Sequence, residues 1–468
     1  MYKSQTVNFL INIVIFILCL MTFVILLNNK NSLYDGYQNM YLLPLFYILS
    51  HFLFINRVLL KNGISIFLAV YLVVSLTRFT ILPYLIFKSG WYFGRSLYLP
   101  TAEQFNQAIF LIIYELLCYN ATIYLAHKYF FNKDFLTKKS RKIIKFESNT
   151  VIYFLFIGIS FLLLLLRPGA LNNISFLSVN SNYMSLAELD TIMSIIILML
   201  SLSRYLLYFI IVKYIINIFN DKHPFLTFVL VCTVTLLNSL IFFGTNRSDF
   251  LFTFIISLII LNYLYGKIGI FISAFFVTLI PSVITRISSF RETSTITSGK
   301  DELIDITDYL QVYLGGIYNV AISLDLPSRA GNIPLLIADI FRSAIGPNVI
   351  LKNFDFITSS QLFNYRLYLS DHVAQIIPMI GQGELYLGTF FSPLLGCVFI
   401  IIAVYFTKVI VETNSFELMF MLMLTSGRFG FVMAQNGNIF INELTFTLPL
   451  FLLIYYINKK VVVKGAKN

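Results

Sequence analysis

The chain has 468 residues, of which 58% are hydrophobic and 12% charged, with a formal net charge of +11 and a mean hydropathy of +0.82. A soluble core does not bury that much apolar surface, and repeated runs of about 20 apolar residues match the thickness of a bilayer. Because these runs do not alternate between apolar and polar residues, they predict an all-α polytopic membrane protein and not a membrane β-barrel.

The apolar runs predict twelve membrane spans. The first run is longer than the core of a signal peptide, and no small-residue cleavage site follows it, so we expect it to be retained. The predicted spans are 7–27, 39–57, 64–87, 103–127, 149–166, 190–215, 225–243, 249–265, 268–285, 385–406, 415–434 and 440–457. We therefore expect a bundle of spans one to nine (1–285), a large external loop (286–384), and spans ten to twelve with a tail (385–468).

Lysine and arginine predict the orientation of the chain. The segment 127–147 and the C-terminal tail are rich in lysine, which is typical of the cytoplasmic side. An even number of spans then puts both termini in the cytoplasm. Arginine is concentrated in the segments predicted to be outside, and its planar guanidinium grips phosphate or carboxylate with two prongs. This skew favours a functional external face.

The loop 286–384 is too long for a connector and too apolar for a disordered segment. Apolar residues spaced by three and four over 303–324 predict a helix that bends at Gly315-Gly316. A second helix is predicted over 333–346. We expect both helices to lie along the outer membrane surface or against the mouth of the bundle. The polar face of the first helix carries Asp305, Asp308, Gln311 and Asn319.

Several arginines lie in segments predicted to be external. Arg247 occupies the turn "GTNRSDF" between spans seven and eight. The others follow span nine or lie near the outer end of span eleven: Arg286, Arg291, Arg342, Arg366 and Arg428. Snorkelling to the interface explains any one of them equally well. As a set drawn from distant segments, they predict a binding site for a diphosphate that needs no P-loop.

Two external residues are candidate bases. His372 is the one histidine of four that the topology places outside. Glu384 lies at the outer entrance of span ten, where Gly381 and Gly383 allow close backbone approach. A hydroxyl nucleophile needs a base within hydrogen-bond reach, so His372 and Glu384 are the predicted catalytic residues.

The motifs of nucleotide and metal enzymes are missing from the sequence. It contains no GxGxxG, Walker, HExxH or paired CxxC pattern, so we expect no cofactor and no metal. Charged residues within the predicted spans are costly in lipid and should face the interior or one another. Those residues are Arg78, Glu115, Arg204, Glu417 and Glu443. Pairs that hold helices together are the expected role, although they also suit an ion path.

The pattern as a whole resembles the Wzy-type family, the bacterial polymerases that join oligosaccharide repeat units of O-antigen and capsule. The similarity lies in about twelve spans, a "G-x-N-R-S" turn at 244–248, a large late external loop with Arg291 and Arg342, and a "G-x-G-E-x-Y-x-G" entry at 381–388. The resemblance implies a membrane glycosyltransferase of C-type architecture in the bacterial plasma membrane. Its implied substrate is an oligosaccharide on undecaprenyl diphosphate, held by loop arginines at the outer leaflet. A flippase and a chain-length regulator are implied partners, and nucleic acid is not.

Three other functions remain open from the sequence. A flippase of lipid-linked oligosaccharides has similar length and charge, but such transporters tend to show two repeated halves, and this chain shows no repeat. Arg78 and Arg204, inside predicted spans, keep that alternative. A ligase-like transferase, which passes finished glycan to another acceptor, shares the architecture and is not separated by the sequence. A non-catalytic partner in an export complex is a further possibility.

Overall fold

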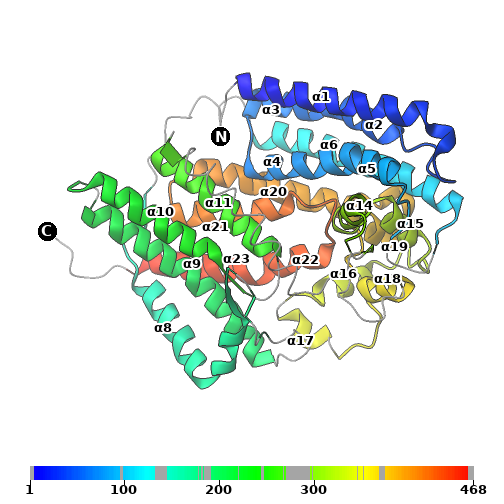
Figure 1. Ribbon diagram of the computed structural model, residues 1–468. Helices are drawn as coiled ribbons and strands as arrows, with labels where there is room; N and C mark the ends of the chain where they lie inside the picture. The colour runs from blue at the N-terminus through cyan, green and yellow to red at the C-terminus, as the bar shows by residue number, and fades with distance from the viewer. Residues whose placement is uncertain are drawn as a thin grey trace. The chain divides into compact units, whose positions relative to one another are not determined.

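The computed structural model describes most of the chain and is almost entirely helical. The described residues are 5–94, 99–131, 145–177, 179–180, 183, 191–219, 221–243, 247–266, 268–269, 296–297, 299–344, 346–351, 353–367 and 375–461. The chain forms two compact units, coloured by residue number in Figure 1. Unit 1 comprises Met1–Ser140, Ser294–Glu412 and Thr425–Phe446, and unit 2 comprises Arg141–Thr293, Thr413–Leu424 and Thr447–Asn468. These units follow contacts within the fold, whereas the predicted division at 286 and 384 concerns the membrane and stays a prediction.

Unit 1 begins with long helices that pack side by side. Their bounds are α1 Gln5–Asn28, α2 Leu42–Ser50, η2 His51–Ile55, α3 Asn56–Asn62, α4 Ile66–Leu76, η3 Thr77–Ile81, α5 Leu82–Ser89 and α6 Ala102–Phe130, with a short 3-10 turn η1 Lys30–Ser32. The segments η2 and η3 are π-helices within otherwise continuous helices. A capping box at Thr101 and Gln104 starts α6, because both side chains bond the free amides of its first turn.

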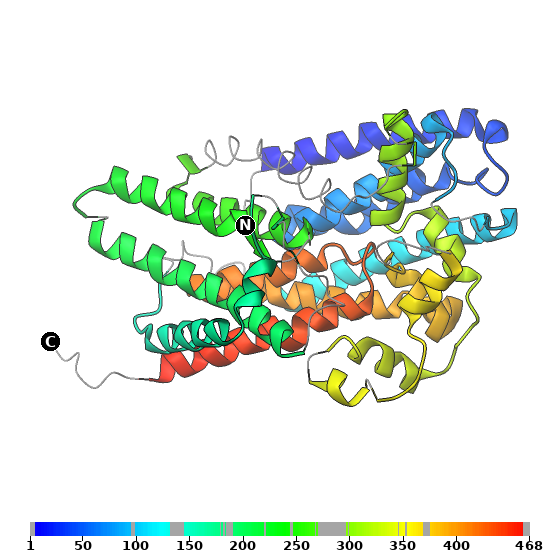
Figure 2. The ribbon, with the colours of Figure 1, turned by 60° about the horizontal axis from the view of Figure 1, so that its bottom comes forward.

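The rest of unit 1 consists of shorter helices and one long one. Their bounds are α14 Glu302–Tyr313, α15 Ile317–Leu324, α16 Ile333–Phe341, α17 Pro347–Leu351, α18 Ser359–Leu367, α19 Met379–Phe391, α20 Leu394–Glu412 and α22 Gly437–Asn442. In Figure 2, α14 lies across the direction of the long helices of this unit. α15 packs on α6 and α19, and α16 packs on α19 and α22. These contacts bring the loop helices against the ends of the long ones.

Unit 2 is a smaller set of helices with one short two-stranded sheet, whose strands are far apart in the sequence. Its elements are α8 Val151–Leu166, η4 Pro168–Asn173, β1 Ile174–Phe176, α9 Thr191–Phe219, α10 Pro224–Leu240, β2 Ile241–Phe243, α11 Arg247–Tyr265 and α23 Leu448–Lys460. Helix α21 (Phe416–Phe429) and the π-helix η5 (Glu443–Thr447) pass from one unit to the other along the chain. β1 and β2 pair antiparallel, with Ile174 opposite Phe243.

The structure confirms an all-α membrane protein in coarse terms. Among the described residues, seven helices are long and apolar enough to cross a membrane, and three further apolar helices are shorter. The twelve predicted spans remain a prediction, and 270–285 of the ninth lies outside the described residues. Predicted span ten, 385–406, is not one helix. Gly388 adopts a φ of +73°, and Pro393 cannot continue the hydrogen-bond ladder, so α19 ends and α20 begins at Leu394.

The polar face of the predicted helix 303–324 is buried in the structure. Asp305, Asp308, Gln311 and Asn319 are all buried, whereas Ile306 is 50% exposed. Buried polar groups need partners: Asp305 accepts bonds from the amides of Thr297 and Gly299, and Gln311 donates to the carbonyl of Phe93. The helix is also two helices, α14 and α15, because Gly315 has a φ of +60°.

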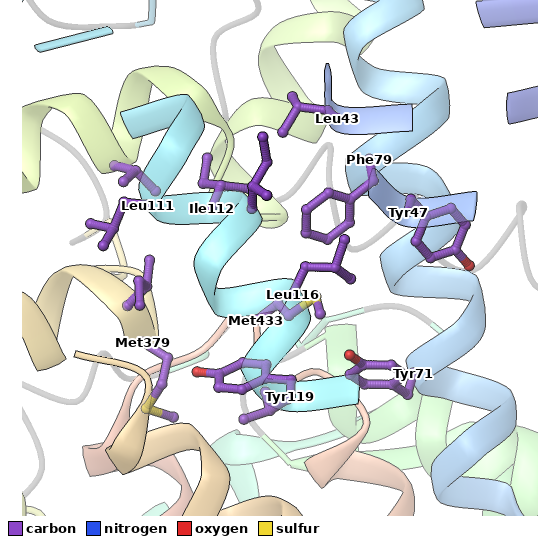
Figure 3. Close-up of a cluster of buried hydrophobic side chains, with 14 of the residues drawn as sticks. Leu43, Tyr47, Tyr71, Phe79, Leu111, Ile112, Leu116, Tyr119, Met379 and Met433 are labelled. Atoms are coloured by element: carbon purple, nitrogen blue, oxygen red, sulfur yellow. The ribbon is translucent and has the colours of Figure 1, made fainter. Parts of the chain in front are cut away.

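The centre of unit 1 is packed with aromatic and aliphatic side chains from distant segments. Figure 3 shows part of this cluster, in which α2, α4, η3, α6, α19 and the segment before α22 contribute side chains. The labelled residues are Leu43, Tyr47, Tyr71, Phe79, Leu111, Ile112, Leu116, Tyr119, Met379 and Met433. All of them are buried. The cluster therefore fixes the start of α19 against α6.

Candidate functional site

The structure describes some of the predicted site residues and not others. His372, Arg286 and Arg291 lie outside the described residues. Arg247 is the first residue of α11, in unit 2. The remaining four, Glu384, Arg342, Arg366 and Arg428, belong to unit 1. The site is therefore built from the contacts of unit 1.

The motif at 381–388 forms most of α19, and its glycines have structural roles. A Cβ on Gly381 would overlap the hydroxyl of Ser323 in α15, and a Cβ on Gly383 would overlap the carbonyl of Ser392. Both glycines are buried. They let α19 approach its neighbours at backbone distance. Gly388 supplies the left-handed turn that ends the regular part of this helix.

Glu384 is the residue of this motif whose carboxylate is not fully used by the fold. Its Oε1 accepts a 2.9 Å hydrogen bond from the hydroxyl of Thr389. Its Oε2 is buried and has no hydrogen-bond partner in the part of the chain that the structure describes. Burial raises the pKa of Glu384 above the ordinary carboxyl value of 4.5, and the bond from Thr389 opposes this in part. A carboxyl whose pKa is raised by burial is a candidate proton-exchanging group.

Glu384 lines a pocket between α6, the end of α15 and α19. The pocket has a volume of about 500 Å³. Its lining residues are Gln107, Phe110, Leu111, Tyr114, Leu324, Glu384 and Thr389. Three of them are apolar and four carry polar atoms, and the volume falls in the range of small-molecule sites, roughly 300–1,000 Å³. A small ligand in this pocket would meet the side chain of Glu384 together with three other polar residues of the lining.

A cation is held beside this pocket. Asp325 follows the lining residue Leu324. It accepts a 2.9 Å hydrogen bond from the side-chain amide of Gln104 and forms an ion pair with Arg366. The side chain of Arg366 is 33% exposed. Arg366, predicted to bind a diphosphate, is therefore already paired with a carboxylate, and its pairing positions it at the loop that follows α15.

A buried polar network lies on the other side of α19. The Oδ2 of Asp339 accepts bonds from the hydroxyl of Tyr386 (2.9 Å) and from the amide of Ser359 (3.1 Å). Gln382 donates to the hydroxyl of Ser359 (3.1 Å) and to Asn438 (2.7 Å). Asp339 and Gln382 are fully buried. The network ties α16, α18, α19 and α22 together, although the buried Oδ1 of Asp339 has no hydrogen-bond partner among the described residues.

Two arginines bind consecutive carbonyls next to this network. The Nη1 of Arg342 donates to the carbonyl of Phe356 (2.9 Å), and the Nη1 of Arg329 donates to that of Ile357 (2.7 Å). Arg329 also donates to the hydroxyl of Tyr386 at 3.3 Å. A guanidinium has five N–H donors, so these bonds orient both groups and leave donors for an anion.

Sequence reasoning did not single out Arg329. It lies in an arginine-rich segment that the sequence predicts to be external, which was a general indication, but no local motif marks it. Only the fold brings Arg329 to the carbonyl of Ile357 and Arg342 to the carbonyl of the preceding residue, Phe356.

Arg428 has a different environment from the loop arginines. It forms an ion pair with Glu443 on the π-helix η5, and Thr425 donates to the same carboxylate. Glu443 is 7% exposed. An anion at Arg428 would have to compete with this carboxylate, as an anion at Arg366 would with Asp325, so the role of Arg428 at a diphosphate stays a prediction.

The expected pairing of charges within the spans is confirmed for Arg78 and Glu115. Glu443 is also paired, with Arg428. In unit 2, Glu417 accepts bonds from the amide of Glu147 and the hydroxyl of Ser415, and Arg204 donates to the carbonyl of Ile241. These contacts hold segments together, as expected for charges in an apolar environment.

Searches against family models, characterised proteins and solved structures found no match for this chain. Within the described ranges, no group of three or more His, Cys, Asp or Glu side chains has a metal-binding arrangement.

Proposed function

We propose that the protein is a membrane polymerase that joins oligosaccharide repeat units carried on undecaprenyl diphosphate, at the outer leaflet of the bacterial plasma membrane. The observation that carries the proposal is Glu384: a half-buried carboxylate with an unpartnered oxygen, lining a pocket next to a loop that also holds arginines. The sequence resemblance supplies the substrate class, and both termini would be cytoplasmic.

In the proposed reaction, the acceptor sugar lies in the Glu384 pocket. Glu384 takes the proton of the acceptor hydroxyl as that oxygen forms a bond to the anomeric carbon of the donor. The bond between this carbon and the diphosphate oxygen breaks, and the diphosphate leaves with the electron pair. The donor is already activated, so the step needs no nucleotide.

The loop arginines would stabilise the charge that grows on the leaving diphosphate. Arg342 and Arg329 are oriented by the carbonyls of residues 356 and 357, and Arg366 by Asp325. Hydrogen-bond donors that are already oriented toward the developing charge need no reorganisation during the reaction, so they lower the barrier most. A single such donor is worth about 2.7–4 kcal/mol in comparable sites. Arg247, Arg286 and Arg291 keep their proposed roles at the diphosphate, and His372 remains the second candidate base.

The direct test is polymerisation in vitro. Purified full-length protein is reconstituted with a lipid-linked repeat unit, without nucleotide or metal, and scored for longer glycans and released lipid diphosphate. Glu384→Gln should lower the rate by about 10²–10⁴-fold. Arg329→Ala and Arg342→Ala should each lower it by about 10²-fold. Lys at these positions should rescue poorly, because an ammonium cannot replace a two-pronged guanidinium.

Arg57→Ala is the matched control for the arginine variants. Arg57 is exposed on α3 and lies over the ring of Tyr124, away from the loop helices. It should polymerise at the wild-type rate. Full activity in the Glu384 and arginine variants at equal protein abundance would overturn the assignment of the site.

A flippase is the second candidate, and the buried Arg78–Glu115 pair in the spanning helices is the observation that favours it. The same vesicles separate the two functions. Movement of the lipid-linked unit across the bilayer without chain growth would support the transporter.

A further inference from the structure

Helices α6 and α20 run side by side in the same direction (Figure 1). Three contacts mark the path: Tyr114 donates to the carbonyl of Phe390, Thr122 lies 3.2 Å from the sulfur of Cys397, and the rings of Phe130 and Tyr405 are 5.7 Å apart. Residue numbers rise together on both helices. Their C-terminal ends therefore lie together, at the end opposite to the Glu384 pocket.

A second cavity lies between these two ends. Its volume is about 860 Å³, and it is lined by Leu125, Lys128, Tyr129, Phe130 and Lys408. Two of these five residues carry an ammonium group, and none of them carries a carboxylate. The nearest ion-pair contact of Lys408 is to Glu412 at 3.9 Å, and Glu412 is 49% exposed. Such an exposed pair is weak, so it leaves the charge of Lys408 available.

The residues of the lining other than the lysines are apolar or aromatic, and two of them are exposed: Leu125 is 59% exposed and Tyr129 77%. Tyr405, which is 47% exposed, packs against the lining residue Phe130. Exposed apolar and tyrosine side chains beside lysines are typical of helix ends at a membrane interface. The lysine-rich segment that follows α6 predicts that this is the cytoplasmic interface.

We propose that this cavity binds the phosphate headgroup of an acidic glycerophospholipid, with Lys128 and Lys408 on the phosphate and the acyl chains along Leu125 and Tyr405. The two lysines can both contact the oxygens of one phosphodiester, and the lining has no carboxylate that would repel it. The exposed apolar walls favour a lipid over free phosphate, because free phosphate gains nothing from them. Basic pockets between spanning helices on the cytoplasmic side are known to take acidic lipid headgroups. This site is independent of the polymerase proposal.

The test uses the full-length protein in phosphatidylcholine nanodiscs or neutral detergent. Apparent thermal stability is followed while phosphatidylglycerol, phosphatidylcholine or inorganic phosphate is added. Phosphatidylglycerol should raise the melting temperature in a saturable way, and the other two should not. Lys128→Gln and Lys408→Gln should each weaken the apparent affinity about fivefold, and the double variant about 25-fold.

Lys61→Gln is the matched control. Lys61 is an exposed lysine in the last turn of α3 and is not part of the cavity lining. It should respond to phosphatidylglycerol as the wild type does. If the double variant does not fold, native mass spectrometry of the wild type in mixed lipid gives the answer. Retention of phosphatidylglycerol over phosphatidylcholine by a fixed stoichiometry supports the site.

Three results would overturn the proposal. The first is an equal effect of phosphatidylglycerol on the wild type and the double lysine variant. The second is an equal effect of inorganic phosphate and phosphatidylglycerol on the wild type. The third is the absence of preferential retention of phosphatidylglycerol in the mass spectra.

Discussion

Arg78 and Glu115 form a fully buried ion pair, with the Nη1 of Arg78 2.6 Å from the Oε2 of Glu115. The Nε of Arg78 also donates to the carbonyl of Gly315 at 3.1 Å. Arg78 lies on the π-helix η3, and a second ion pair of unit 1, Arg428–Glu443, likewise has one partner, Glu443, on a π-helix. Arg78 therefore connects two helices that are long and apolar enough to cross a membrane to the bend between α14 and α15.

Breaking this pair on one side should be more damaging than removing it. Arg78→Met or Glu115→Leu alone leaves an uncompensated buried charge and should cost about 3–5 kcal/mol. The double variant Arg78→Met/Glu115→Leu should recover most of that loss, because no charge stays buried. Apparent melting temperatures of the purified variants in one detergent measure the effect. A double variant less stable than either single one would show that the pair does not act as a unit.

Gly383 should tolerate no side chain. Gly383→Ala would push a methyl group into the carbonyl of Ser392 and force the backbone to move, at a cost of about 1–3 kcal/mol. The control is Gly158→Ala in α8, where a methyl group meets nothing within 4 Å. That change should be neutral or stabilise by about 0.5–1 kcal/mol, as for any glycine inside a helix. Thermal unfolding of both variants measures the contrast, and equal stability of the two would contradict the close packing of α19.

Glu384 should make stability depend on pH in a defined direction. Its pKa is raised in the folded protein by burial, so the folded state holds its proton more firmly than the unfolded chain. The wild type should therefore lose stability as the pH rises from the ordinary carboxyl value of 4.5 through the raised value. Glu384→Gln, which keeps the shape without the charge, should lack this loss and be more stable at neutral pH.

Melting temperatures of wild type and Glu384→Gln between acidic and neutral pH test this expectation. Glu103→Gln, at an exposed position in the first turn of α6, should keep the wild-type dependence. Polymerisation should rise with pH through the same raised pKa, because a base must be ionised to accept a proton. A Gln variant that is less stable than wild type at neutral pH would argue against a strained carboxylate.

The hydroxyl of Tyr386 should be required by the buried Asp339. Tyr386→Phe removes a donor from a carboxylate that is fully buried and should cost about 1–3 kcal/mol. The double variant with Asp339→Asn should lose less stability than the sum of the losses in the two single variants, because both variants break the same hydrogen bond. Tyr405→Phe, at a tyrosine that is 47% exposed, is the control and should change stability little. Additive effects of the two network variants, measured by thermal unfolding, would exclude a shared bond.

Local patterns in the sequence were sufficient to locate most helices. A run of apolar residues is a property of neighbouring positions, so predicted spans such as 7–27 and 103–127 correspond closely to α1 and α6. The joint at Gly315-Gly316 and the special character of 381–388 were also visible, because glycine is needed where the backbone turns left-handed or approaches another segment. These features depend on the residue itself and its immediate neighbours.

Contacts between distant segments were decided by the tertiary structure alone. The sequence marked Glu443 as a charge within a span and Arg428 as an external arginine, but only packing pairs them with each other. The sequence showed that α14 has a polar side, but only the structure shows that this side is buried and bonded to Thr297, Gly299 and Phe93. Arg329 and Arg342 are adjacent only because both reach residues 356–357. A hydrophobic pattern says which residues leave water, but the partner of a buried polar group depends on where the rest of the chain lies.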